Sequence, residues 1–441
     1  MNGKALSRFV FLATTTLLAA CGSDNNKIGS TVKGERIAVI EQAKTLEADK
    51  GLSNRKPELP REIVNLSWPQ AGYDSEHAMP DVEVSKHPRI VWQSDIGEGS
   101  DSDFKLLAHP VADRGTVYTL DAQGLVRATG AKSGERKWEF DTTPKDSDDK
   151  AIGGGLAIDG GTLYATTGFG DVYALDAKTG HVKWRKSLLN PLRAAPTVAN
   201  GRVYVVSIDN EISALDAATG EVLWHQSGIA ESATLMGASG PAVQGDSVIV
   251  AYNSGEIYDL RAQNGHALWN YSLASATQAG ALPAIADIRG LPVIDRNRVF
   301  AISHSGRIAC IDQTTGDRVW ESDIGGIDTP VVAGDAVFIY GGEGQLIALT
   351  RDTGRPMWVA PLQKLSDPSD KDSDPVVWTG PVLAGGRLWM VNSLGHLASF
   401  SPADGSPIDS FDLGSPLYLS PIVVDRTLYV VTDNGTLVAL R

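Results

Sequence analysis

The sequence predicts an all-β fold, an eight-bladed β-propeller of four-stranded antiparallel blades. The main observation is a pattern that occurs eight times along the 441 residues. A proline, or once a leucine, stands eight residues before a large apolar residue. Six residues further on comes a glycine or asparagine, and in six complete repeats a tryptophan follows after fourteen more. The marker positions are Pro110, Tyr118, Gly124 and Trp138; Leu156, Tyr164, Gly170 and Trp184; Pro196, Tyr204, Asn210 and Trp224; Pro241, Ile249, Gly255 and Trp269; Pro292, Phe300, Gly306 and Trp320; Pro330, Phe338, Gly344 and Trp358; Pro381, Trp389, Gly395 and Asp409; Pro421, Tyr429 and Gly435. A period of about 40–50 residues indicates a repeat architecture.

Each repeat contains short segments with the alternation expected of β-strands. Residues 202–207 and 211–216 alternate with a period of two, and turns containing glycine precede or follow them at 199–201 and 216–220. In the second turn, Asp216 can accept hydrogen bonds from backbone amides while Gly220 tolerates a positive φ. The tryptophan should begin the fourth strand. Four antiparallel strands per repeat, without helical segments between them, favour a propeller over a sandwich.

The two ends of the chain are predicted to complete one blade. The eighth repeat ends at Arg441 with a third strand but no fourth. Residues 91–97 match residues 319–325, which include a fourth strand, almost position for position. The N-terminal segment should therefore supply the missing strand and close the ring without open sheet edges.

Seven of the ten tryptophans occupy the same place in the repeat. They are Trp92, Trp138, Trp184, Trp224, Trp269, Trp320 and Trp358, and Asp409 replaces the tryptophan in the seventh repeat. A position that recurs in this way, with a large apolar side chain, is typical of packing between neighbouring blades. We expect these tryptophans to be structural and not to bind a ligand.

Residues 1–20 have the features of a signal peptide. Lys4 and Arg8 precede an apolar segment, residues 9–18, that is too short for a permanent membrane helix. Small residues then lead to Cys21, as in a bacterial lipoprotein signal, where the cysteine is lipidated; the alternative is an ordinary signal peptide with an incidental cysteine. We expect a lipidated tether and docking arm at residues 21–86 and the propeller at residues 87–441.

Composition and residue spacing favour no catalytic or metal site. The formal charge is −14, from 53 acidic and 39 basic residues, which argues against nucleic-acid binding. The eight histidines lie at unrelated points of the repeat, and the acidic loops 146–149 and 367–374 lack the ligand ladder of a calcium site. Cys310 occupies a strand position and is predicted to be a buried, inert thiol. No cofactor and no metal are therefore predicted.

Variation in repeat length points to one face of the ring. The distance from the proline position to the tryptophan position is 28 residues in each complete repeat. The connector from a tryptophan to the next repeat varies, from 10 residues after Trp320 to 23 after Trp269. Because this connector joins the outermost strand of one blade to the innermost strand of the next, all such connectors leave the same face. Variable loops on a rigid scaffold commonly carry function.

The segment from Ala214 to Trp224, with its relatives at 174–184 and 310–320, resembles the tryptophan-docking repeat of the pyrroloquinoline-quinone propellers. Together with the lipoprotein signal, the chain resembles the BamB family of the bacterial outer-membrane β-barrel assembly (Bam) machinery. The resemblance implies a non-enzymatic scaffold on the periplasmic face of the outer membrane. It also implies binding to the POTRA domains of BamA, through it to the other Bam subunits, and assistance to nascent outer-membrane proteins.

The same resemblance implies one contact site. The BamA-binding loop of the family has a Leu-Arg pair shortly before Ala-Pro, matched here by Leu192 and Arg193 before Ala195 and Pro196. Leu192 would be an apolar anchor and Arg193 a bidentate partner for a carboxylate. An ordinary solvent-exposed loop charge is the alternative for Arg193. An acidic pair of the family has no counterpart in residues 232–239.

Two other functions stay open. A quinoprotein dehydrogenase of this superfamily would use adjacent cysteines beside the quinone and a calcium ion, whereas Cys21 and Cys310 are far apart in the sequence. A ligand-binding periplasmic propeller outside the Bam complex would need no such residues.

Overall fold

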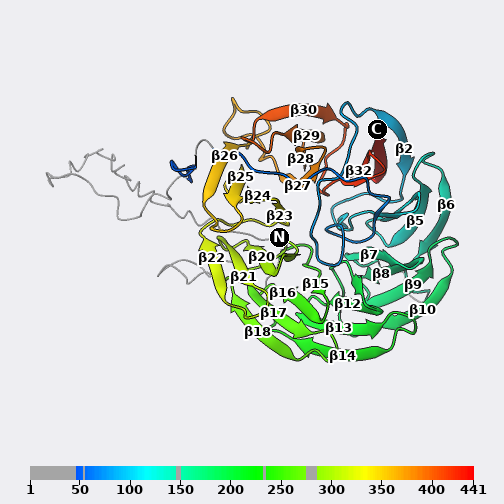
Figure 1. Cartoon of the computed structure of the whole chain (residues 1–441). Coiled ribbons are helices and arrows are strands. Elements are labelled where there is room, and N and C mark those ends of the chain that lie inside the picture. Colours follow the sequence, from blue (N-terminus) through cyan, green and yellow to red (C-terminus); the bar gives the residue numbers. More distant parts are fainter. Residues whose placement is uncertain (1–45, 53–54, 146–149, 232–234, 275–285) are drawn as a thin grey trace, which may run out of the picture. The chain divides into compact units, whose positions relative to one another are not determined.

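The computed structural model describes residues 46–52, 55–145, 150–231, 235–274 and 286–441. The expected signal peptide and Cys21 therefore lie outside the described residues. Residues 46–441 form one compact unit, in which eight antiparallel sheets are arranged as blades around a common axis (Figure 1). The predicted eight-bladed propeller is confirmed. Among the described residues no helix is long and apolar enough to cross a membrane.

Every blade has four strands of its own, and in blades one to seven these run outward from the centre of the ring in sequence order. Blade one has β1 (Ser67–Trp68) as an additional inner strand, and the outermost strand of blade eight is β2 (Ile90–Asp95). Blades one to four are β3 (Val111–Asp113), β4 (Thr116–Leu120), β5 (Leu125–Gly130) and β6 (Arg136–Asp141); β7 (Gly154–Asp159), β8 (Thr162–Thr167), β9 (Asp171–Asp176) and β10 (Val182–Ser187); β11 (Thr197–Ala199), β12 (Arg202–Val206), β13 (Glu211–Asp216) and β14 (Val222–Ser227); β15 (Ala242–Gln244), β16 (Ser247–Ala251), β17 (Glu256–Arg261) and β18 (Ala267–Ser272).

Blades five to eight continue the same arrangement. They are β19 (Val293–Asp295), β20 (Arg298–Ser303), β21 (Arg307–Asp312) and β22 (Arg318–Ser322); β23 (Val331–Ala333), β24 (Ala336–Gly341), β25 (Gln345–Thr350) and β26 (Pro356–Pro361); β27 (Trp378–Ala384), β28 (Arg387–Asn392), β29 (His396–Phe400) and β30 (Pro407–Asp412); β31 (Ile422–Val424), β32 (Thr427–Thr432), β33 (Thr436–Leu440) and β2 (Ile90–Asp95). This strand order gives the ring two faces. The connector face carries the segments that join one blade to the next. The turn face carries the turns between the first and second strands and between the third and fourth strands of each blade.

Blade eight is completed by the N-terminal strand. β2 pairs antiparallel with β33, so that Trp92 faces Ala439 and Asp95 faces Thr436. In Figure 1 β2 lies beside the C-terminal strands, near the label C. The predicted closure of the ring is confirmed. As a result, the outer edge of blade eight is formed by β2, like the fourth strand of any other blade.

The recurrent tryptophans join neighbouring blades. Each is the third residue of its strand, so the strand begins before the tryptophan and not at it as expected. Each indole Nε1 donates to a backbone carbonyl in the next blade at 2.8–3.1 Å. The acceptors are Ala131, Ala177, Ala217, Ala262, Gln313, Arg351 and Pro402. The predicted packing role is confirmed.

A glycine in the next blade makes room for each indole ring. A Cβ atom added at Gly220, for example, would lie 2.6 Å from Cε3 of Trp184. The equivalent glycines are Gly134, Gly180, Gly220, Gly265, Gly316, Gly354 and Gly405. The Asp-x-x-Thr-Gly type of turn, found on the turn face, is therefore the docking surface for the tryptophan of the preceding blade.

The junction between blades seven and eight lacks this tryptophan. Asp409 stands at the position and forms an ion pair with Arg387 of its own blade. In blade eight the third and fourth strands come from opposite ends of the chain, so there is no turn between them for an indole to contact. Backbone bonds of 2.9 Å between Arg89 and Arg441 hold these two ends together.

The N-terminal arm, defined as residues 46–52 and 55–86, runs across the turn face and contacts the innermost strands of most blades. β1 (Ser67–Trp68) adds to the inner edge of β3, with Trp68 opposite Ala112. Other arm residues bond to the equivalent strands: Asn65 to Val423, Pro69 to Ile158, Gln70 to Val198, Ser75 to Val243 and Glu76 to Ile294. The arm thus satisfies backbone groups on the channel edge of six blades.

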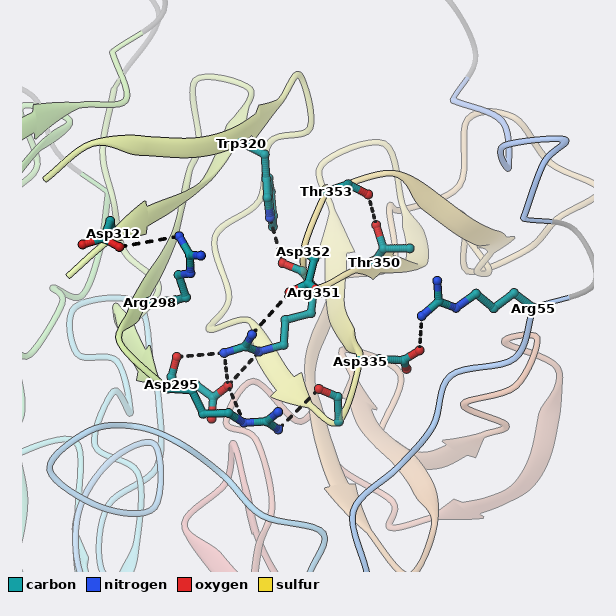
Figure 2. A network of polar contacts seen from close by, with 12 residues as sticks. Arg55, Asp295, Arg298, Asp312, Trp320, Asp335, Thr350, Arg351, Asp352 and Thr353 are labelled. Carbon is teal, nitrogen blue, oxygen red and sulfur yellow. Dashed lines mark hydrogen bonds and ion pairs between the residues drawn. The ribbon is translucent and has the colours of Figure 1, made fainter. Parts of the chain in front are cut away.

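The arm reaches blades six and seven as well. Val82 pairs in parallel with Ala384 of blade seven. The guanidinium of Arg55 lies 2.6 Å from the carboxylate of Asp335 in blade six, as Figure 2 shows. The same figure shows Arg351 of blade six bonded to Asp295 of blade five at 2.8 Å. The sequence predicted a docking arm within residues 21–86, and the described part of this arm contacts all eight blades.

Candidate partner-binding face and central cavity

Large apolar side chains are exposed on the connectors on either side of blade three. Leu189, between blades two and three, has a relative exposure of 101%. Ile229 and Met236, between blades three and four, are 58% and 48% exposed. Single exposed apolar residues are common on protein surfaces, but a group on neighbouring loops is typical of an interaction site. These three residues lie on the connector face, where the sequence predicted function.

The side chain of Leu192 is buried between blades two and three. It is 1% exposed and packs among Tyr164, Val198 and Val203. Its backbone N donates to the carbonyl of Thr167 at 3.2 Å, and it forms an isolated β-bridge with Ser207. Leu192 therefore fixes the connector against blades two and three, and the fully exposed leucine of the same connector is Leu189.

Arg193 follows directly and turns toward the axis of the ring. Gly153 gives it space, because a Cβ atom at residue 153 would be 2.8 Å from Cγ of Arg193. Its Nε is buried without a hydrogen-bond partner, and its guanidinium makes no ion pair with the described residues. A guanidinium left without a carboxylate in a protein with a net charge of −14 is available to an external anion.

Arg193 lines a central cavity of about 150 Å³. The floor is formed by the arm, chiefly by Trp68, His77 and Met79. The walls come from the connectors and from the first residues of the innermost strands. They include Leu106, His109, Arg193, Ala195, Ala238, Arg289, Leu291, Asp328, Val331 and Tyr418. The arm thus closes the turn-face end of the channel, and the cavity lies on its connector side.

Burial controls the charge states around this cavity. It lowers the pKa of His77 to about 4, against the bond of 2.8 Å between His77 Nδ1 and the carbonyl of Pro292. It also lowers the pKa of His109 to about 4, with a further contribution from Arg289. Burial raises the pKa of Asp328 to about 6, which Arg289 opposes. At neutral pH both histidines are neutral, and the cavity presents two guanidinium groups and one carboxylate.

Residues suited to metal binding or nucleophilic catalysis do not gather at this site. Among the described residues, no group of three or more histidine, cysteine or acidic side chains could hold a metal ion. The Cys310 thiol is buried, and burial raises its pKa to about 12, so it is a poor nucleophile. Gly154 and Gly155 open strand β7 and not a helix, so they do not form the helix N-terminus that commonly binds phosphate. The acidic loop 146–149 lies outside the described residues.

The ring of tryptophan-docked blades defines a β-propeller built from pyrroloquinoline-quinone-like repeats, and its connectors expose apolar side chains. A family model described as outer membrane protein assembly factor BamB matches residues 122–360. The chain therefore belongs to the BamB family of outer-membrane protein assembly factors, which are not enzymes. The family connects the chain with the Bam machinery of the outer membrane.

Individual relatives support the assignment. The outer membrane protein assembly factor BamB of Alkalilimnicola ehrlichii is 35% identical over 82% of this chain and 91% of its own length. That of Salmonella typhimurium is 28% identical over the same shares. The crystal structure of BamB from Moraxella catarrhalis has a TM-score of 0.67 at 22% identity, covering 80% of this chain and 99% of that chain.

A quinohemoprotein alcohol dehydrogenase from Comamonas testosteroni has a similar TM-score, 0.66, at 15% identity. The alignment covers 85% of this chain and 80% of the dehydrogenase. At this identity the likeness shows a common fold alone. The quinoprotein alternative is replaced by the assembly-factor assignment, which rests on the family model and the more similar relatives.

The sequence pointed to the connector face and to Leu192 and Arg193, but not to Leu189, Arg289 or Asp328. Leu189 lies three residues before Leu192, and nothing in the sequence distinguishes the exposed leucine from the buried one. Arg289 and Asp328 are in connectors of different blades, so their approach to one cavity depends on the ring. The only available signal was their common place shortly before a proline position of the repeat, at Pro292 and Pro330.

Proposed function

We propose that this assembly factor binds the POTRA domains of BamA through the connectors on either side of blade three. The observation that carries the proposal is that Arg193 has no ion-pair partner among the described residues, while Leu189 on the same connector and Ile229 and Met236 on the next one are exposed. Apolar anchors around a charged group able to form two bonds are typical of binding hot spots. Through BamA the chain would contact the other Bam subunits and assist nascent outer-membrane proteins.

Leu192 and Arg193 have different parts in this proposal. Leu192, buried against blades two and three, holds the connector in one conformation. Arg193 then presents its guanidinium to a carboxylate of the partner without a large loss of conformational freedom. Leu189 supplies the exposed apolar contact that the sequence had suggested for Leu192.

Co-purification from outer membranes tests this interface. Arg193→Ala and Leu189→Asp should each reduce recovery of BamA with the tagged chain at least tenfold, about 1.4 kcal/mol or more of binding free energy. Arg261→Ala is the matched control, because Arg261 ends β17 on the turn face and its side chain is 46% exposed. Circular dichroism of all three variants checks that the propeller is intact.

The proposal fails if the unaltered chain does not recover BamA, or if both connector variants recover it as well as Arg261→Ala does. If Arg261→Ala alone reduced the recovery of BamA, the interface would lie on the turn face instead. A stable propeller that recovers no Bam subunit would instead favour a ligand-binding protein outside the complex.

We further propose that Cys21 carries the lipid that attaches the chain to the periplasmic face of the outer membrane. The support is the apolar segment and the small residues before Cys21, in a family of outer-membrane assembly factors. In this proposal residues 1–20 are removed as a signal peptide, residues 21–86 form the tether and arm, and residues 87–441 form the propeller. The intact mass of the mature chain should show lipid on Cys21. A Cys21→Ser variant that stays in the outer-membrane fraction would contradict this.

A further inference from the structure

The central cavity contains polar atoms that the protein itself does not satisfy. Oδ2 of Asp328 and Nε of Arg193 are both buried without a hydrogen-bond partner, and both residues line the cavity. Buried polar atoms in folded proteins are nearly always bonded to protein, water or a ligand. Two unsatisfied atoms of opposite character around one space indicate that something polar occupies it.

The charges around the cavity limit what the occupant can be. Arg193 and Arg289 form no hydrogen bond or ion pair with the described residues, although Arg289 is close enough to Asp328 and His109 to affect both pKa values. A further carboxylate, Asp287, is buried and accepts a hydrogen bond of 2.7 Å from the backbone N of Leu235. Burial raises the pKa of Asp287, and Arg289 opposes this rise. The cavity thus offers two guanidinium groups for an anionic group and one carboxylate oxygen, Oδ2 of Asp328, for a hydrogen-bond donor.

The size and walls restrict the occupant further. A volume of about 150 Å³ holds a molecule of roughly six to ten non-hydrogen atoms, since a cavity of about this size holds benzene. Apolar side chains, among them Leu106, Leu291 and Val331, form part of the lining. These residues favour a ligand with a short apolar part beside its polar groups.

We propose that the central cavity is a binding site for a small organic carboxylate that also carries a hydrogen-bond donor, such as an amino acid or a hydroxy acid. Arg289 and Arg193 bind the carboxylate, and Oδ2 of Asp328 accepts the hydrogen bond from the ammonium or hydroxyl group. The arm supplies the floor, with Trp68 and His77 below the ligand. This site shares Arg193 with the proposed interface, whereas Arg289 and Asp328 belong to the cavity alone, and it adds a small-molecule ligand to the proposed protein-binding function.

Isothermal titration calorimetry on the full chain tests the proposal with L-valine, L-alanine and lactate as probes. At least one should bind with a Kd of about 1 mM or lower, and its amide, which lacks the carboxylate, should bind at least tenfold more weakly. Arg289→Gln should weaken binding of the same probe at least tenfold. Arg296→Gln is the matched control, because Arg296 follows β19 on the turn face of the same blade and is 64% exposed in its side chain.

A second variant addresses the donor subsite. Asp328→Asn should weaken the binding of L-valine more than the binding of isovalerate, which has the same carbon skeleton without the ammonium group. Three results would each overturn the proposal and leave water as the occupant. They are no binding of any probe at about 10 mM, well above the expected Kd; equal binding of the acid and its amide; and unchanged binding by Arg289→Gln. Because Arg289 lies outside the proposed BamA contacts, Arg289→Gln should still recover BamA. Failure of the ligand site and failure of the interface are therefore distinguishable.

Discussion

Single glycines determine how closely the blades pack. Gly220 has a φ of +75° and lies against the indole of Trp184, which donates to the carbonyl of Ala217 at 3.0 Å in the same turn. Two separate demands meet at this residue: a left-handed backbone and the absence of a Cβ atom. Gly201, on the same face of the same blade, has a φ of +73°, but a Cβ atom added there would meet no other atom within 4 Å.

Comparison of these two glycines measures the tryptophan contact alone. Gly201→Ala should lower the free energy of unfolding by about 1 kcal/mol, the cost of a left-handed alanine. Gly220→Ala should lower it by about 1–3 kcal/mol more, because the added methyl group overlaps the indole. Chemical denaturation of both variants checks the difference. Equal losses would show that the indole can move aside without cost.

At the scale of the element, the arm has a pH-sensitive attachment. His77 is 2% exposed, and its pKa of about 4 lies below the ordinary value of 6.5. The folded state therefore keeps the ring neutral while the unfolded chain takes up a proton. Stability from the neutral His77 is fully present above pH 6.5 and is lost as the pH falls from 6.5 to 4.

His77→Asn isolates this effect, because asparagine does not titrate and tolerates the φ of 58° at this position. Relative to the variant, the unaltered chain should lose about 3 kcal/mol between about pH 7 and pH 4. Buried carboxylates whose pKa is raised, such as Asp74 and Asp81, favour folding at lower pH. Because both proteins contain them, their contributions cancel in the difference between the two proteins. Melting temperatures measured across this range would refute the prediction if the two curves ran parallel.

The arm also shows where sequence reasoning stops. The strands of the ring could be predicted because each repeat carries its own alternation, turns and tryptophan, which are local signals. The arm has none of these, and its bonds are made by backbone atoms or single side chains such as Asn65 and Gln70, which contact strands far away in the sequence. The sequence predicted a docking arm within residues 21–86 but not the strands that it contacts. Likewise, Leu192 was predicted near the partner face, but its burial depends on packing between two blades.

At the scale of the whole molecule, the loss of one tryptophan follows from the way the ring closes. The indole of blade seven would need a turn in blade eight between β33 and β2, and those strands are the two ends of the ring. Asp409 pairs with Arg387 instead. The exception to the repeat is therefore a consequence of the closure and not a random substitution.

This explanation predicts the result of restoring the repeat. Asp409→Trp should leave stability unchanged or lower it slightly, because the ion pair is lost and no docking turn is available. Trp358→Ala, at the preceding junction, should lower the free energy of unfolding by about 3–5 kcal/mol. Denaturant titration compares the two variants. An increase in stability with Asp409→Trp would mean that blade eight provides a docking surface of its own.

Closure by β2 and β33 also sets the order in which the ring can be completed during folding. β2 emerges early and must wait for β33, the last strand to be delivered, before its inner edge is paired. Until then the nascent ring has two open sheet edges, which are the features most prone to aggregation. A ring that lacks β33 therefore leaves the edges of both β2 and β32 unpaired.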